Sequence, residues 1–171
     1  MDSKTEFNDS PAAISPKIWS LLSKMQPQEW DVSVFRSVEG GGTGEEFAEN
    51  LKKDGDSPGN KWYDCYPGET WIEANFKKPV RIKFLQLKSA NDCPRRDPYD
   101  ITISVKKPGQ SNLTQIFEFM IVFDERHQIL DLHVDTVDEV STLRIEINRN
   151  YSSAIGEDDD GTQLAQVIFY V

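Results

Sequence analysis

The residues best suited to binding chemistry lie in segment 91–98, Asn-Asp-Cys-Pro-Arg-Arg-Asp-Pro. Its two prolines restrict the backbone, and Arg95 and Arg96 carry planar guanidinium groups that donate paired hydrogen bonds to carboxylates or phosphates. The segment therefore has the composition of a preorganised recognition loop. A structural role is equally consistent with it, in which Asp92 or Asp97 pairs with an arginine and fixes the loop.

Tyrosines form a second set of candidate ligand-binding side chains. In segment 62–67, Trp-Tyr-Asp-Cys-Tyr-Pro, the rings of Tyr63 and Tyr66 could stack on a sugar or receive a peptide side chain. Trp62 is expected in the core. Tyr151 is a further candidate, because a glycan site would place exposed tyrosines beside polar side chains of the 91–98 loop.

Catalysis and zinc binding are weakly supported. His127 and His133 lie beside an expected strand but in no catalytic motif, and Cys65 and Cys93 lack the paired spacing of zinc ligands. Carboxylates are plentiful, so no pair can be assigned to the facing positions that a glycosidase requires. A hydrolase is therefore the most distant of the functions considered.

Composition restricts the partners. The 171 residues include 19 Lys and Arg against 29 Asp and Glu, giving a formal net charge of −10. This balance opposes nucleic-acid binding, which depends on clustered basic residues. No apolar run reaches the roughly 18 residues that cross a bilayer, so no transmembrane segment is expected. The first thirty residues lack an apolar signal core, so the protein is expected to be cytoplasmic if Met1 is the natural start.

Two kinds of element must position these side chains. Residues 1–30 are expected to be a flexible lead-in and a short helix, because apolar residues recur there at helical spacing before Pro27. From residue 31 the period changes to two, which predicts an all-β antiparallel sandwich over 31–171. The expected strands are 71–76, 80–87, 99–105, 113–123, 129–134, 143–147 and 164–171. Between 80 and 87 the apolar phase shifts, which indicates a bulge or a strand buried on both faces.

Several separated motifs resemble the discoidin family, also called the coagulation factor 5/8 type C family. They comprise Ala48 to Asp56 followed by Lys61-Trp62 and the Trp-led strand 71–76, then segment 89–98 with strand 99–105, and the closing strands 144–147 and 166–171. The resemblance covers residues 31–171. It implies an eight-stranded jelly-roll sandwich of the galactose-binding-like type, with ligands held by loops at one end.

The resemblance also implies a structural calcium ion. In many members calcium fixes the turn that corresponds here to Asp54-Gly55-Asp56. Asp54, Asp56 and Asn60 carry the oxygen ligands that calcium prefers, and the later Glu157 could complete the shell. Calcium is therefore the expected cofactor.

The function implied is that of a non-catalytic binding module. An acidic chain with two cysteines and no signal is more similar to intracellular members that act as adaptors than to lectins. Recognition of a protein or peptide is therefore the leading hypothesis, and carbohydrate binding in a lectin-like manner is the alternative. The predicted ligand-binding residues are Tyr63, Tyr66, Asp92, Arg95, Arg96 and Tyr151.

Overall fold

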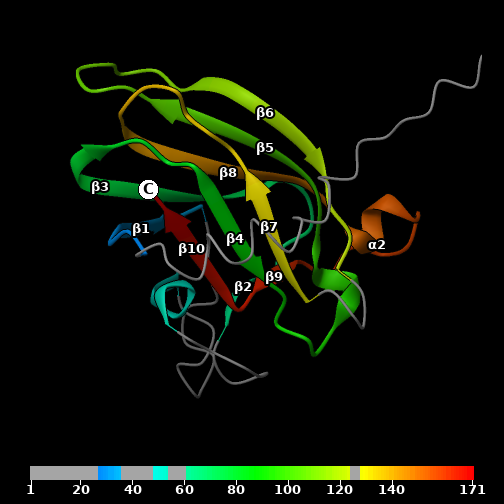
Figure 1. Cartoon of the computed structure of the whole chain (residues 1–171). Helices are drawn as coiled ribbons and strands as arrows, with labels where there is room; N and C mark the ends of the chain where they lie inside the picture. The colour runs from blue at the N-terminus through cyan, green and yellow to red at the C-terminus, as the bar shows by residue number, and fades with distance from the viewer. Residues whose placement is uncertain (1–26, 36–47, 54–60, 124–127) are drawn as a thin grey trace, which may run out of the picture.

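The computed structural model describes residues 27–35, 48–53, 61–123 and 128–171. In these residues the chain forms antiparallel sheets (Figure 1). The first sheet has the order β1 (Asp31–Val34), β3 (Thr70–Val80), β8 (Val140–Asn150), β5 (Pro98–Lys106), β6 (Thr114–Met120). The second has the order β10 (Gln166–Tyr170), β4 (Phe84–Lys88), β7 (Ile129–His133), and β2 (Trp62–Asp64) pairs with β9 (Thr162–Leu164). Three short helical turns are η1 (Ala48–Lys52), η2 (Pro94–Arg96) and α2 (Tyr151–Ala154).

The all-β antiparallel sandwich predicted from the sequence is confirmed. The two larger sheets contain five and three strands, which matches the eight that the family resemblance implied. The period-two pattern did not reveal β1 or the short β2–β9 pair. The expected N-terminal helix falls within 1–26, outside the described residues. The described α-helix, α2, directly follows β8, where Asn150 caps it by accepting a hydrogen bond from the Ser153 amide at 2.9 Å.

Period-two alternation builds the core. Leu143, Ile145 and Ile147 of β8 are buried, while the intervening Arg144 and Glu146 are half-buried on the outer face. The inner face of the second sheet contributes a matching set, Leu85, Leu87, Leu132, Val167 and Phe169. Burying each such side chain stabilises the fold by about 1.5–3 kcal/mol. The two faces together give a rigid base for the loops.

The apolar phase shift between residues 80 and 87 has a different origin from the one expected. β3 ends at Val80, which pairs with Val140 in the first sheet, and β4 starts at Phe84, which pairs with His133 in the second. Residues 81–83 connect the two sheets. The prediction of one continuous strand is therefore wrong, because the chain passes from one sheet to the other here. In each sheet, the side that faces the core decides which alternate residues are apolar.

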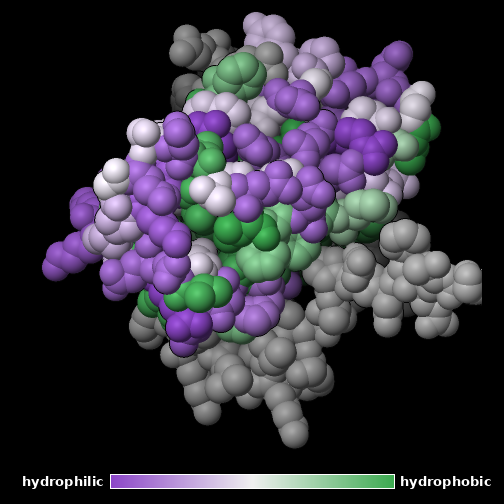
Figure 2. Space-filling model, turned by 90° about the horizontal axis from the view of Figure 1, so that it is seen from above, coloured by the Kyte–Doolittle hydropathy of each residue, from purple (hydrophilic) through white to green (hydrophobic). Residues whose placement is uncertain are grey.

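The face seen from above in Figure 2 is mostly hydrophilic, with hydrophobic side chains gathered near its middle. Among the described residues, no helix has the length and apolar character needed to cross a membrane.

Candidate functional site

The loops that carry the candidate residues meet at one end of the sandwich. β5 starts where β8 ends, since Pro98 pairs with Asn150, and β4 ends where β7 starts, since Lys88 pairs with Ile129. Connections 65–69, 89–97 and 151–161, together with residues 121–123 and 128, consequently converge at the end where α2 lies in Figure 1. We call this the loop end.

The loop end contains a cavity of about 320 Å³. One wall is apolar and is formed by the residues that follow β6, Ile121, Val122 and Phe123. The other lining residues come from the β4–β5 connection and the start of α2. They are mixed in character and consist of Ser89, Asn91, Pro94, Asp97, Pro98 and Tyr151. Gln128 is the remaining residue of the cavity lining.

Asp97 is the charged group of this cavity. Its residue is only 5% exposed, and its carboxylate accepts a hydrogen bond from the Ser89 hydroxyl at 2.8 Å. Burial raises the pKa of the carboxyl to about 7, with a smaller contribution from the nearby Asp92, and the Ser89 hydrogen bond opposes the rise. The Asp97 carbonyl also accepts the Tyr151 amide at 2.9 Å, which ties α2 to the loop.

Two amide side chains and a tyrosine line the cavity together with Asp97. Asn91 has a backbone φ of 57°, a left-handed conformation that asparagine tolerates better than most residues. Its side-chain oxygen accepts a hydrogen bond from the Gln128 amide at 2.7 Å. Tyr151 is 37% exposed, and its ring lies 6.3 Å from that of Tyr99. The cavity thus combines an exposed ring face with several hydrogen-bonding groups on an apolar base.

Arg96 and Tyr63 form a packed cluster beside the cavity lining. The Arg96 guanidinium lies 4.5 Å from the centroid of the Tyr63 ring and donates to the Asp160 carboxylate at 2.9 and 3.1 Å. These hydrogen bonds lower the pKa of the Asp160 carboxyl and raise that of Arg96. The Tyr63 hydroxyl donates to the Asp160 carbonyl at 2.6 Å. The cluster therefore fixes connection 151–161 against β2.

The other predicted ligand-binding residues lie in separate contacts. Arg95 pairs with Glu157 at 3.0 Å on the surface. Asp92 accepts hydrogen bonds from Lys61 and from the buried Gln163. Among the described residues, neither Asp92 nor Asp97 pairs with an arginine. The internal pairing considered from the sequence is therefore wrong, because Arg95 and Arg96 pair with Glu157 and Asp160 of connection 151–161 instead.

The two arginines should differ in their effect on stability. Arg96→Ala is expected to lower the free energy of unfolding by about 1–2 kcal/mol, because it removes the stacking on Tyr63 and both hydrogen bonds to Asp160. Arg95→Ala should cost less than about 0.5 kcal/mol, since its exposed pair with Glu157 is weak. Urea denaturation of both variants measures the difference. Equal losses would contradict the structural role given to Arg96.

Comparison with known proteins gives structural matches alone. No protein-family model matches the sequence, and no curated protein matches it. The F5/8 type C domain of a Bacteroides fragilis protein aligns with a TM-score of 0.65 at 15% identity, over 85% of this chain and 95% of that one. This chain has the F5/8 type C fold.

Two further structures with this fold are sugar-binding modules. A CBM32 module of Clostridium perfringens GH89, in complex with GalNAc-β-1,3-galactose, aligns with a TM-score of 0.66 at 11% identity, over 83% of this chain and 95% of that one. Chitosan-binding module 1 of a Paenibacillus sp. IK-5 chitosanase/glucanase aligns at 0.59 with 18% identity, over 84% and 96%. The F5/8 type C resemblance inferred from the sequence is thus confirmed at the level of the fold.

The calcium site expected for an F5/8 type C domain stays a prediction. Asp54, Asp56 and Asn60 lie outside the described residues, so the structure places only Glu157. The Glu157 carboxylate pairs with Arg95, which leaves it poorly disposed to neutralise a cation. Among the described residues, no cluster of three or more His, Cys, Asp or Glu side chains is positioned to hold a metal.

Of the six ligand-binding residues predicted, Tyr151 alone lines the cavity. Tyr66 is 56% exposed on connection 65–69, outside the cavity lining. The prediction did not assign Ser89, Asn91, Asp97 and Gln128. Asn91 and Asp97 lie in the loop singled out from the sequence, but nothing in the sequence indicated that Gln128, from a distant connection, would meet Asn91.

Proposed function

We propose that this chain is a non-catalytic module that binds a carbohydrate in the loop-end cavity. The observation that carries the proposal is the cavity lining, where the half-exposed Tyr151 ring adjoins Asn91, Asp97 and Gln128. A sugar ring presents apolar C–H faces and a periphery of hydroxyl groups, so it needs both an aromatic surface and convergent donors and acceptors.

The comparisons support this choice over protein recognition, which the sequence had favoured. The CBM32 module of GH89 and the family 32 module of C. perfringens NanJ are described in complex with GalNAc-β-1,3-galactose and with galactose. Both share this fold, and the cavity here is large enough to take a monosaccharide. The Ser, Asn, Asp and Gln side chains in its lining can form hydrogen bonds with the hydroxyl groups of a sugar.

The cavity chemistry also supports a binding role over hydrolysis. Glycosidases generally use two facing carboxyl groups, one as acid and one as nucleophile or base. Asp97 is the sole carboxyl group among the described residues that line the cavity, and it is hydrogen-bonded to Ser89. A single buried acid can orient a hydroxyl group but lacks the partner that bond cleavage requires.

Titration calorimetry with galactose, GalNAc-β-1,3-galactose and chitosan oligosaccharides tests the proposal. We expect at least one to bind with a Kd in the range of about 10 μM to 10 mM, as is usual for small polar ligands. Tyr151→Ala should weaken that binding by about tenfold or more, because the stacking surface is lost. Tyr66→Ala is the matched control and should leave the affinity unchanged.

Two results would contradict the assignment. If no sugar in a broad glycan array binds the folded protein, carbohydrate binding is wrong and protein recognition becomes the leading function. If Tyr66→Ala weakens binding and Tyr151→Ala does not, the sugar site lies elsewhere on the loop end.

A further inference from the structure

The loop-end cavity offers charge of one sign. Among the described residues that line it, Asp97 is the sole charged side chain, and no lysine, arginine or histidine is present. The two arginines of the 91–98 loop have acidic partners, since Arg95 pairs with Glu157 and Arg96 with Asp160. A ligand in this cavity therefore meets one acidic group and no described basic one.

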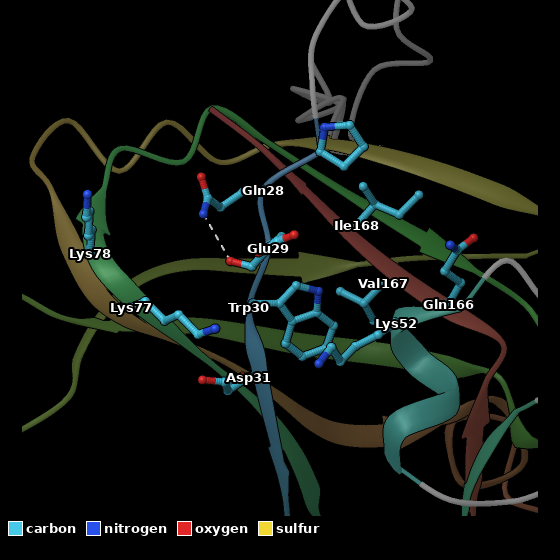
Figure 3. Close-up of a pocket in the computed structure, with 11 residues that line it drawn as sticks. Gln28, Glu29, Trp30, Asp31, Lys52, Lys77, Lys78, Gln166, Val167 and Ile168 are labelled. Atoms are coloured by element: carbon cyan, nitrogen blue, oxygen red, sulfur yellow. Dashed lines mark hydrogen bonds between the residues drawn. The ribbon is translucent and has the colours of Figure 1, made fainter.

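Basic side chains line a different cavity. It has a volume of about 740 Å³ and lies away from the loop end, along the edges of the two sheets. Its charged lining residues are Glu29, Asp31, Lys52, Lys77 and Lys78. Figure 3 shows the side chains of Lys52 and Lys77 extending toward Trp30 from different elements. The cations that an acidic ligand would need are thus in this second cavity and not at the loop end.

The Asp97 carboxylate receives few hydrogen bonds. The residue is 5% exposed, and within the described chain the Ser89 hydroxyl is the one group that donates to its side chain. An ionised carboxylate can accept about four hydrogen bonds on its two oxygens. The second oxygen is not sealed in the core, because the fully buried side-chain atoms that lack a partner belong, among the described residues, to Thr70 and Gln163. A ligand in the cavity that Asp97 lines can therefore donate to this oxygen.

The surroundings of Asp97 leave its negative charge largely uncompensated. Burial raises the pKa of the carboxyl to about 7, and the nearby Asp92 adds to the rise. A cation bound beside it would favour the ionised form and supply the missing compensation. A sugar hydroxyl group donates a single hydrogen bond and brings no charge. An ammonium group brings a full positive charge and three donors, and its hydrogen bonds to carboxylates are stronger.

We propose that the loop-end cavity selects amino sugars, which carry an ammonium group in place of a ring hydroxyl, over neutral and acidic sugars. This inference rests on the proposed carbohydrate-binding function and adds the class of sugar. The ammonium group binds the Asp97 carboxylate while the ring lies against Tyr151, which is 37% exposed. N-acetylation of the amine removes its charge, and an acidic sugar has the same sign of charge as Asp97. Both changes should therefore weaken binding.

Titration calorimetry near neutral pH with matched monosaccharides tests this selection. Galactosamine, galactose, N-acetylgalactosamine and galacturonate share one ring and differ in the charge that they carry. We expect galactosamine to bind at least about tenfold more tightly than galactose, because charge-assisted hydrogen bonds are about twice as strong as neutral ones. Galacturonate should not bind at the loop end. Glucosamine, glucose and N-acetylglucosamine are compared in the same way, since the charge argument applies to either ring.

Asp97→Asn tests the residue to which the selection is assigned. Asparagine keeps the shape of the side chain and an oxygen for the Ser89 hydrogen bond, but it has no charge. The variant should bring the affinities for galactosamine and galactose to within about threefold of each other. Asp131→Asn makes the same chemical change in β7, outside the cavity lining, and should keep the preference of the wild type. If Asp97→Asn does not fold, the sugar series on the wild type still decides the question.

The possible results separate this inference from the proposed function. Equal affinities for galactosamine and galactose, both weakened by Tyr151→Ala, would overturn the selection and leave carbohydrate binding in place. Galacturonate binding that Tyr151→Ala weakens would have the same meaning, as would a preference for the amino sugar that persists in Asp97→Asn. If no neutral or amino sugar binds at about 10 mM, carbohydrate binding and the selection are both wrong.

Discussion

Asp97→Asn is expected to stabilise the protein above pH 7 and to reduce the dependence of its stability on pH between about 4 and 7. The carboxyl has a pKa of about 7 in the fold, against an ordinary value of 3.8. The folded state therefore holds a proton that the unfolded chain releases. The stability tied to this proton is fully present below pH 4 and is lost as the pH rises to 7.

The size of this effect follows from the separation of the two pKa values. A difference of about three pH units corresponds to roughly 4 kcal/mol, so we expect Asp97→Asn to raise the free energy of unfolding at pH 8 by about 2–4 kcal/mol. Asparagine retains an oxygen for the 2.8 Å hydrogen bond from Ser89, which keeps the local geometry. Below pH 4 the variant and the wild type should have similar stability.

Urea denaturation at several pH values measures this difference. Asp131→Asn is the matched control, because burial also raises the pKa of Asp131 while its Gln86 hydrogen bond opposes the rise. Asp131 is less buried than Asp97, so its substitution should change the pH dependence less. Parallel pH profiles for wild type and Asp97→Asn would show that the Asp97 carboxyl ionises normally in the folded protein.

At the proposed sugar site, ligand binding and stability should be coupled through this carboxyl. Protonated Asp97 can donate a hydrogen bond, whereas the ionised group only accepts. Ionising the Asp97 carboxyl, in a residue that is 5% exposed, lowers the stability of the folded protein. A bound sugar that donates a hydroxyl hydrogen bond to the carboxylate would offset part of this loss. The stabilisation that a sugar confers on the proposed site should therefore change around pH 7.

The sequence predicted the sandwich well because strand pairing leaves a period of two wherever one face is buried. In β8, the alternation of Leu143, Ile145 and Ile147 with charged residues is visible without coordinates. The pattern failed at residues 80–84, because the alternation Val-Arg-Ile-Lys-Phe continues through the point where the chain passes from one sheet to the other. It also missed β1, β2 and β9, which are three or four residues long and too short for a period to appear.

The loop end was harder to predict than the strands. The sequence identified the 91–98 loop, but hydrogen-bond partners across loops depend on how distant connections meet. Arg96 forms its hydrogen bonds with Asp160, which is 64 residues away in the sequence, and not with a carboxylate of its own loop. The burial that changes the pKa of Asp97 arises from packing around the loop, so residue type alone could not separate Asp97 from the exposed Asp92.

Gly161→Ala is expected to be the most destabilising single change at the loop end. Gly161 has a φ of 115°, a conformation that residues with a Cβ rarely adopt. A Cβ at this position would lie 2.1 Å from the backbone oxygen of Asp64 and 2.9 Å from the Cα of Cys65. Both contacts are with backbone, so the β2–β9 pair would have to separate. The Gly161 carbonyl would also move away from the buried Asn150 amide, which donates to it at 2.6 Å.

We expect Gly161→Ala to lower the free energy of unfolding by at least about 3 kcal/mol, measured by urea denaturation. Gly156→Ala provides the matched control. Gly156 has a φ of 75°, but no heavy atom lies within 4 Å of its added Cβ, so this variant carries backbone strain without a collision. Its cost should be near 1 kcal/mol. Similar losses in the two variants would mean that backbone conformation accounts for both, and that the close approach of β2 to Gly161 does not constrain the loop end.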